Sequence, residues 1–273
     1  MKMDFAGNLY RLRKENRLTQ EQVAKRTGVS FQAVSKWENG QSYPDIELLP
    51  VIARVLETSL DALMGYPVEK SVTTDYERRY QQAGFYWGNQ IWQGALSVLR
   101  FLPPERPMRL LDVGCGEGQA AVFFGKNSYQ VSGFDISPSG IAKGRLLAAE
   151  QHVDVDFFEA DINRYQTDAV YDVMYASGSL QYIRPERRAS VIGWMKQQTR
   201  PGGIHVLNVF VEKPFLPVPP DWETQEYFWQ TGELFRLYHD WRIEEMREEI
   251  FDCMSGGVPH RHCMDVLTAR RVE

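Results

Sequence analysis

The stretch RLLDVGCGEG, residues 109–118, decides how most of this 273-residue chain folds. Its first half is a short apolar run typical of a buried strand, and its second half places a glycine at every other position. The glycines are Gly114, Gly116 and Gly118. The residues that follow, QAAVFFGK, predict a helix whose N-terminus points at the turn. We therefore expect a strand, a turn bare enough for a ligand to approach the backbone, and a helix.

Acidic residues in and after this motif indicate which kind of ligand it would bind. Asp112 lies inside the motif, and about twenty residues further on the run VSGFDI ends a second apolar strand in Asp135. This is the spacing at which a carboxylate meets ribose hydroxyls in a βαβ unit. A third segment, VDFFEADI, carries Asp161 at its end, just before Ile162. An acidic turn suits a ligand with cationic sulfonium and ammonium groups better than it suits a pyrophosphate.

The order LDVGCGEG, FDIS, EADI, YDVMYASGSL and PGG resembles the class I S-adenosylmethionine-dependent methyltransferases. The resemblance implies a Rossmann-like, doubly wound α/β sheet and S-adenosyl-L-methionine as cofactor. By this resemblance Asp135 would hold the ribose hydroxyls, Asp161 with Ile162 the adenine, and the glycine backbone the amino-acid end. The full cofactor set implied is Asp112, Gly114, Cys115, Gly116, Gly118, Asp135, Ile136, Asp161, Ile162 and Ser177. The alternative is the same fold with an empty switch point.

Strand and helix patterns alternate from residue 109 onward, as a parallel sheet requires. Right-handed crossovers then place every motif at the carboxyl edge of the sheet. The aromatic segment 76–102 reads as helical, and within it Tyr80 and Trp87 belong either to a lid over the substrate or to the core. Strands are expected near 109–113, 130–134, 155–158, 170–175 and 204–210, and helices near 118–126, 138–151 and 185–199.

The N-terminal part predicts five short helices. Thr19, with Gln22 at the capping-box position, starts the second, and Ser30 starts the third after a glycine turn. The stretch TQEQVAKRTGVSFQAVSKWENGQSYPDIELL resembles the helix-turn-helix domain of the Cro-like (XRE) repressors. The DNA-binding residues implied by this resemblance are Gln20, Ser30, Phe31, Gln32, Ser35 and Lys36. A helical interaction domain without DNA is the alternative, and a single helix-turn-helix predicts a homodimer on DNA.

Composition and charge limit the possible domain organisation, ligands and cellular compartment. We expect a helix-turn-helix domain over residues 1–66, a polar linker over 67–74 and a methyltransferase domain over 75–273. The net charge of −5 argues against polyanion binding by the whole molecule, although the N-terminal end is locally basic. Three irregularly spaced cysteines predict neither a disulfide framework nor a zinc cluster and fit the reducing cytoplasm. No apolar run is long enough to predict a membrane span.

The C-terminal part indicates the acceptor. An aromatic strand, the segment ELFRLYHDW and a late His-Arg before the last strand resemble the TehB-type tellurite-resistance methyltransferases, over residues 75–273. The resemblance implies a small-molecule acceptor, such as tellurite or a related oxyanion, oriented by His260, Arg261 and His262. Strand alternation sends the two histidines to one face and Arg261 to the other, so the three do not share one pocket. A surface role is the alternative, and a His-x-His metal pair without further ligands is disfavoured.

Three functions are compatible with these motifs. The leading hypothesis is a methyltransferase that acts on a small molecule and carries a DNA-binding domain. Alternatively, the chain is a transcription regulator whose methyltransferase fold senses S-adenosylmethionine or another effector. A nucleic-acid methyltransferase is disfavoured, because ASGSLQY stands where many DNA and amine methyltransferases carry an Asn/Asp-Pro-Pro-Tyr-type motif.

Overall fold

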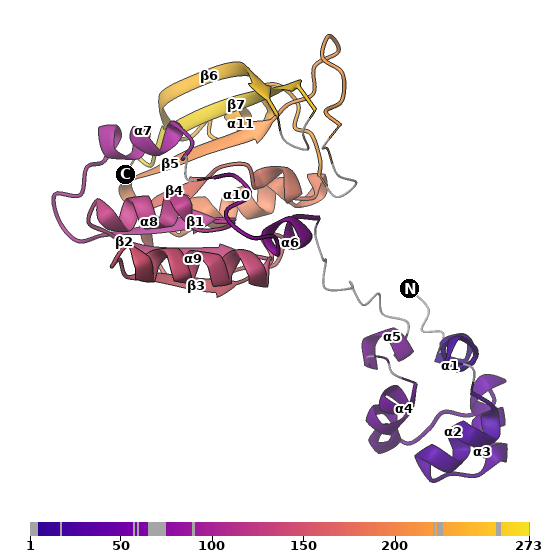
Figure 1. The fold of residues 1–273 in the computed structure, drawn as a ribbon. Coiled ribbons are helices and arrows are strands. Elements are labelled where there is room, and N and C mark those ends of the chain that lie inside the picture. The colour runs from indigo at the N-terminus through magenta and orange to yellow at the C-terminus, as the bar shows by residue number, and fades with distance from the viewer. Residues whose placement is uncertain are drawn as a thin grey trace. The chain divides into compact units, whose positions relative to one another are not determined.

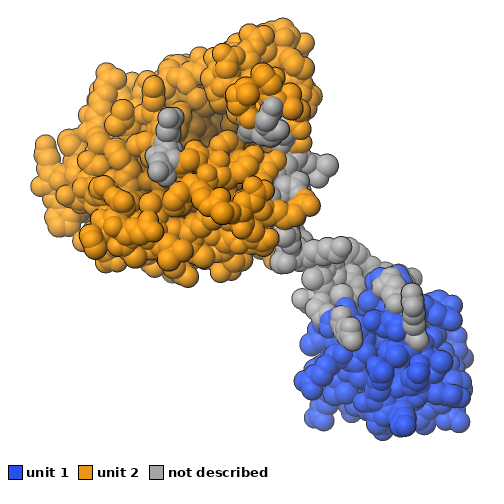
Figure 2. Space-filling view, in the orientation of Figure 1, with its two compact units in different colours: residues 1–72 blue, residues 73–273 orange. Residues whose placement is uncertain are grey.

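The computed structural model describes residues 5–16, 18–56, 58, 60–64, 75–88, 91–220, 222, 226–254 and 258–272. The chain divides into two compact units, residues 1–72 and 73–273, which Figure 2 colours separately. The predicted linker over 67–74 lies outside the described residues. No helix in the described ranges combines the length and the apolar character needed to cross a bilayer.

The first unit consists of short helices (Figure 1), and side-chain caps set the starts of the second and third of them. Thr19 and Gln22 form the predicted capping box, and the hydroxyl of Ser30 accepts the backbone N–H of Ala33. The chain after Asp45 begins with a 3₁₀ turn, and Pro50 then stands in the first turn of the α-helix that follows, a position that proline favours. The helices are α1 (Phe5–Glu15), α2 (Gln20–Thr27), α3 (Phe31–Glu38), η1 (Ile46–Leu48), α4 (Leu49–Val55) and α5 (Leu60–Met64).

A buried ion pair ties the first three helices together. Arg13 donates from Nε to Glu38 Oε1 at 2.5 Å, and only 6% and 3% of the two side chains are exposed. Gln20 donates its amide to the other oxygen of Glu38 at 2.7 Å. Burial acts to raise the pKa of Glu38, but the hydrogen bonds from Arg13 and Gln20 outweigh it and hold that pKa below its ordinary value. The carboxylate therefore stays ionised inside a small apolar core.

The second unit is built on a seven-stranded sheet of the described residues, with strand order β3-β2-β1-β4-β5-β7-β6. The first five strands run parallel and confirm the predicted ones, while β7 pairs antiparallel with both β5 and β6. The strands are β1 (Met108–Val113), β2 (Tyr129–Asp135), β3 (Val155–Glu159), β4 (Tyr171–Ala176), β5 (Thr199–Phe210), β6 (Arg242–Cys253) and β7 (His260–Arg270).

Helices cover both faces of this sheet, which gives the three layers of a doubly wound fold (Figure 1). The helices α7 (Gly94–Phe101), α8 (Gln119–Lys126) and α9 (Pro138–Glu150) share one apolar cluster with one face. The helices α10 (Arg188–Gln197) and α11 (Glu233–Arg236) pack with the other face. The switch in strand order between β1 and β4 leaves the loops after β1, β2 and β4 at one edge.

The segment 76–102 is not one helix, and this expectation was wrong. It contains α6 (Asp75–Tyr80) and α7, separated by turns. Gly84 has φ +75°, a left-handed conformation that a helix does not contain. The second of these helices does carry an apolar face, because Ala95 and Val98 on α7 are fully buried in the apolar cluster on the sheet. The break allows α6 to leave the sheet face and reach the glycine-rich turn.

Candidate active site

The glycine-rich turn after β1 is packed against other parts of the protein more tightly than any side chain would permit. A Cβ at Gly114 would lie 2.3 Å from Cβ of Ser179, in the loop after β4. A Cβ at Gly116, where φ is +53°, would lie 2.9 Å from the hydroxyl of Tyr80 on α6. The missing side chains thus serve close approach by α6 and by the loop after β4. The sequence had pointed to ligand approach and to the backbone dihedrals of the turn as the reasons for these glycines.

Asp135, at the end of β2, is held in place by the turn. Its Oδ2 accepts the backbone N–H of Gly116 at 2.9 Å, and its Oδ1 accepts that of Ser137 at 2.9 Å. Burial raises the pKa of this carboxyl, although the backbone hydrogen bonds act against the rise. The carboxylate is therefore fixed in orientation next to the turn.

Asp112, the second-last residue of β1, is buried with one carboxyl oxygen that lacks a hydrogen-bond partner among the described residues. Only 2% of the residue is exposed, and its Oδ2 has no hydrogen-bond partner among the described residues. Burial, reinforced by the negative charge of Asp135, raises the pKa of Asp112 to about 8. Two carboxyl groups with raised pKa values at one sheet edge are a feature typical of functional sites. A cationic group beside them would relieve the charge repulsion.

The remaining residues predicted for the cofactor follow neighbouring strands at the same edge. Ile136 follows β2 and is half-buried, and Cys115 fits between the glycines with 8% exposed. Asp161 follows β3, and its Oδ1 accepts the backbone N–H of Asn163 at 2.8 Å. Ile162 packs at the border of the apolar cluster. The carboxyl edge thus collects this part of the predicted set.

Ser177 follows β4 and is held by a side chain that the sequence did not single out. Asn208 on β5 donates its amide to Ser177 Oγ at 3.3 Å. The carbonyl oxygen of the same amide accepts the N–H of Gly178 at 2.9 Å. Asn208 therefore sets the shape of the loop at the point where the edges of β1 and β4 meet.

A second contact missed by sequence reasoning attaches α6 to this edge. Glu77 on α6 accepts hydrogen bonds from the hydroxyl of Ser137, and from the N–H and hydroxyl of Ser139 at 3.2 and 2.6 Å. Burial acts to raise the pKa of Glu77, but these hydrogen bonds outweigh it and lower that pKa below its ordinary value. The carboxylate also faces the N-terminus of α9, whose dipole favours negative charge.

The turns after α6 lie against the glycine-rich turn as well. Glu117 is buried, pairs with Lys143 at 2.7 Å and accepts the backbone N–H of Tyr86 at 2.8 Å. Trp87, which is 45% exposed, stacks on Tyr76 with ring centroids 6.1 Å apart. Tyr80 is buried, so the two predicted lid residues differ: Tyr80 lies inside and Trp87 lies at the surface.

The C-terminal cluster brings together two of its three predicted residues. His260 and His262 place their Nε2 atoms 2.9 Å apart, whereas Arg261 is exposed and, by strand alternation, points to the opposite face. The expectation that the three do not share one pocket therefore agrees with the structure. Cys253, on the neighbouring strand β6, joins the histidines, and sequence reasoning missed it.

The residues predicted to contact DNA lie on or beside α3. Phe31, Gln32 and Lys36 are exposed and Ser35 is half-buried. The hydroxyl of Ser30 is engaged as the helix cap. Gln20 differs from the expectation, because its amide is hydrogen-bonded inside the unit to Glu38 rather than directed away from it.

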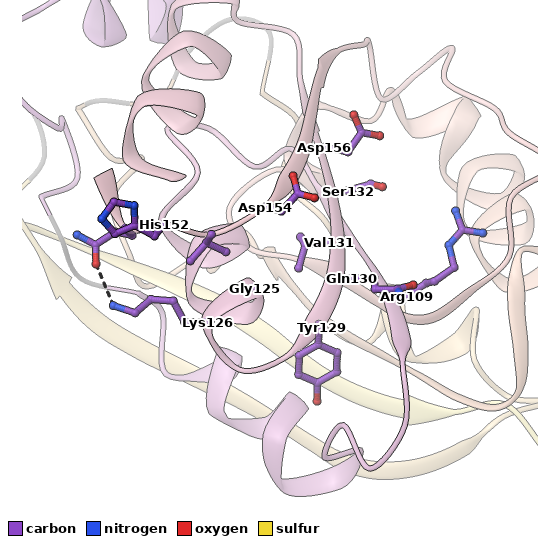
Figure 3. A pocket seen from close by; sticks show the side chains of 12 residues that line it. Arg109, Gly125, Lys126, Tyr129, Gln130, Val131, Ser132, His152, Asp154 and Asp156 are labelled. Carbon is purple, nitrogen blue, oxygen red and sulfur yellow. Dashed lines mark hydrogen bonds between the residues drawn. The ribbon is translucent and has the colours of Figure 1, made fainter. Parts of the chain in front are cut away.

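A pocket at the opposite edge of the sheet contains none of the predicted site residues. It is lined by the starts of β1, β2 and β3 and by the ends of α8 and α9 (Figure 3). Labelled side chains around it include Arg109, Lys126, His152, Asp154 and Asp156. Ligands of doubly wound sheets bind beyond the carboxyl ends of the strands, so this depression lies on the wrong side for the chemistry predicted here.

Comparisons with known proteins agree with the geometry of both units. Residues 9–63 match the family model described as Helix-turn-helix, and residues 110–203 match the one described as Methyltransferase domain. The first unit is also similar to the HTH-type transcriptional activator BcrR of Enterococcus faecalis, with 42% identity over 63 residues, 23% of this chain and 31% of that protein. The chain therefore carries a helix-turn-helix domain and a methyltransferase domain.

The second unit is similar to a probable S-adenosyl-L-methionine-dependent methyltransferase, TehB of Haemophilus influenzae. Identity is 24% over 144 residues, which is 53% of this chain and 49% of TehB, so the chain spans about half the length of that relative. The crystal structure of H. influenzae TehB matches with TM-score 0.60 and 20% identity, over 72% of this chain and 65% of that one.

Another solved neighbour carries a ligand. The N-methyltransferase NodS of Bradyrhizobium japonicum WM9, in complex with S-adenosyl-L-homocysteine, matches with TM-score 0.55 and 14% identity, over 75% of this chain and 100% of that one. At these identities the solved structures show the fold alone, which is that of the class I methyltransferases.

Proposed function

We propose that the protein is an S-adenosyl-L-methionine-dependent methyltransferase with a small-molecule acceptor, joined to a DNA-binding helix-turn-helix domain. The observation that carries the proposal is the pair formed by the buried Asp112 and the half-buried Asp135 beside the glycine-rich turn, both with raised pKa values. A buried carboxyl oxygen without a partner among the described residues calls for a ligand that donates hydrogen bonds or carries positive charge. S-adenosylmethionine has an ammonium, a sulfonium and two ribose hydroxyls, and therefore supplies both.

The residues present fit this cofactor. Asp135 is the candidate for the ribose hydroxyls, since it follows β2 and is already oriented by backbone hydrogen bonds. Asp161 and Ile162 are the candidates for the adenine. The backbone of 114–118 and the carboxyl of Asp112 are the candidates for the amino-acid end. Bound there, the cofactor supplies an activated methyl group, so the reaction needs neither a covalent enzyme intermediate nor a metal.

The role of the protein is then to hold the acceptor in line with the methyl group and to exclude water. The segment 75–88 is suited to exclude water, because Glu77, Tyr80 and Tyr86 all contact the turn or its neighbours. Ser177 and Gly178, oriented by Asn208, stand where the acceptor would approach. Departure or closure of the segment 75–88 would control access.

For the acceptor we propose a small anion or thiol, with tellurite or a related chalcogen oxyanion as the first candidate. The similarity to TehB supports this class, as does the sequence ASGSLQY after β4, which lacks the side chains that bind a base or amide nitrogen in many methyltransferases. The exposed polar side chains of α3, above all Gln32 and Lys36, support DNA binding by the first unit.

An acceptor screen tests the proposal. The full chain is incubated with methyl-labelled S-adenosylmethionine and a panel of tellurite, selenite, small thiols and amines, with Asp135→Ala as the control. We expect a methylated small product from the wild type and at least about a 100-fold lower yield from the variant. Methyl incorporation into duplex DNA instead would identify a nucleic-acid methyltransferase and overturn the acceptor assignment.

A regulator is the second candidate, and the helix-turn-helix match over residues 9–63 favours it. In this case S-adenosylmethionine or another effector binds the same turn and changes the affinity for DNA without turnover. Turnover distinguishes the enzyme from the regulator. A protein that binds the cofactor, methylates nothing in the panel and alters its DNA affinity on cofactor addition is the regulator.

A further inference from the structure

We propose that Cys253, His260 and His262 form a binding site for a divalent transition-metal ion of the zinc type, at the end of the β6–β7 hairpin. The thiol sulfur and one ring nitrogen of each histidine all lie within 4.8 Å of one another. The site is separate from the glycine-rich turn, and its existence does not rest on methyl transfer.

The strand register brings the three side chains to one place. Cys253 is the direct partner of His260 in the antiparallel β6–β7 ladder, and Phe251 is the partner of His262. Directly opposed residues in such a ladder have neighbouring side chains on the same face, and residues two apart on one strand share that face. Cys253, His260 and His262 therefore converge because of backbone pairing that continues without a register shift from Glu245 to Cys253.

The hydrogen bond of His260 prepares it as a ligand. Its Nδ1 lies 2.7 Å from the carbonyl oxygen of Val258. A carbonyl only accepts, so Nδ1 is the donor in this hydrogen bond, and Nε2 is the ring nitrogen left to bind a metal ion. Nε2 is the atom that faces His262. Metal-binding histidines are typically oriented in this way, with the other ring nitrogen donating to a carbonyl or carboxylate.

The surroundings of His262 hold its ring in a fixed position, which favours a metal ion bound at one defined place. Only 6% of this residue is exposed, and its ring packs against Phe210 and Phe251 with centroids 4.9 and 5.5 Å away. The two Nε2 atoms lie 2.9 Å apart. Two bonds of about 2.0–2.1 Å at a tetrahedral angle would place the nitrogens roughly 3.3 Å apart, so the rings need to separate by only a few tenths of an ångström.

The donor set selects the type of ion. One thiolate and two imidazoles suit Zn²⁺, and a similar set suits Co²⁺, whereas hard cations such as Mg²⁺ prefer oxygen ligands. Three protein ligands also leave one coordination position open. The site lies on the end of β7 that pairs with the carboxyl end of β5, so the open position belongs to the carboxyl edge of the sheet. Water or a small anion would fill it.

Cobalt titration of the full chain, without a histidine tag and after treatment with a chelator, tests the site. We expect one Co²⁺ per chain, with the visible absorption of a tetrahedral ion, a near-ultraviolet thiolate-to-metal band, and displacement by Zn²⁺. Cys253→Ser should remove the thiolate band. His262→Ala should weaken binding by about 100-fold or more.

Matched variants separate these ligands from other thiols and imidazoles of the chain. Cys263→Ala removes the thiol next to His262 on the same strand, and His239→Ala removes an exposed imidazole near α11. Both should keep the full stoichiometry and both absorption features. Absence of stoichiometric binding by the wild type would overturn the proposal. So would a thiolate band that survives in Cys253→Ser.

Discussion

The two units expose and bury their ionisable side chains in opposite ways. In the helix-turn-helix unit, Lys36 stands exposed on α3, while Arg13 and Glu38, which tie α1 to α3, are buried as a pair. In the methyltransferase unit, the carboxyl of Asp112 is buried beside Asp135 without such a partner among the described residues. Exposed cations suit a long polyanion, and buried carboxyls suit a small ligand that replaces the water they lost.

The largest effect that tests this comparison is expected at Asp135. Asp135→Ala removes the carboxylate oriented by Gly116 and Ser137, so we expect the affinity for S-adenosylmethionine to fall by about 100-fold or more in calorimetry. The affinity for duplex DNA should not change. Asp154→Asn, at the opposite edge of the sheet, is the control and should leave both affinities unchanged. Loss of both affinities in Asp135→Ala would contradict the separation of the two units.

Acid should destabilise the methyltransferase unit through the buried His205, and the first unit contains no histidine. His205 lies between Thr199 and the Tyr238 hydroxyl, and its burial lowers its pKa from 6.5 to about 3. Between pH 6.5 and about 3, His205 is protonated in the unfolded chain but neutral in the folded chain. The free energy of unfolding therefore falls as the pH falls. Each pH unit between these values costs up to about 1.4 kcal/mol.

The raised pKa of Asp112 acts in the opposite direction over the same pH range, so the wild type must be compared with His205→Gln. Between pH 6.5 and 4.5 the free energy of unfolding of the second unit should fall by about 2–3 kcal/mol more in the wild type than in the variant, measured by urea denaturation. The first unit should show no such difference. Equal pH dependence of wild type and variant would refute the assignment to His205.

A smaller effect is expected on the exposed side of the comparison. Lys36→Ala should weaken binding to a mixed-sequence DNA duplex by about tenfold and reduce the slope of log affinity against log salt by about one. Arg54→Ala, an exposed cation on α4, is the matched control and should change binding less. Cofactor affinity should be the same in all three proteins. An unchanged salt slope would exclude Lys36 from the DNA interface.

The smallest effect concerns Asp112. Because its pKa of about 8 falls when a cation binds nearby, the affinity for S-adenosylmethionine should rise about three- to tenfold between pH 6.5 and 8. The rise in affinity should be smaller in Asp112→Asn, because an amide does not ionise. Any titration of the ligand itself affects both proteins equally and cancels in the comparison. Parallel affinity curves for the two proteins would show that Asp112 does not ionise on binding.

Local motifs were predictable from the sequence, and contacts between distant segments were not. The strand, glycine-rich turn and helix around 109–126, and the capping box at Thr19, are encoded by residues within a few positions of one another. Glu77 meets Ser137 across 60 positions, through a helix whose direction depends on the break at Gly84. That glycine was a visible signal against one continuous helix from 76 to 102.

Register was the second source of missed residues. Alternation within one strand correctly separated Arg261 from the two histidines. Which residue of β6 opposes His260 depends on how the hairpin closes, and a shift of one position would replace Cys253 by a neighbour that faces the other way. The third member of the cluster was therefore accessible only from the paired strands.

The most direct test of the central claim is a crystal structure of the full chain with S-adenosyl-L-homocysteine. We expect the ligand along 114–118 at the carboxyl edge, with its ribose hydroxyls on Asp135 and its adenine beside Asp161 and Ile162. Ligand density in the pocket of Arg109 and Asp156 at the opposite edge, or no ligand at the glycine-rich turn at saturating concentration, would contradict this expectation.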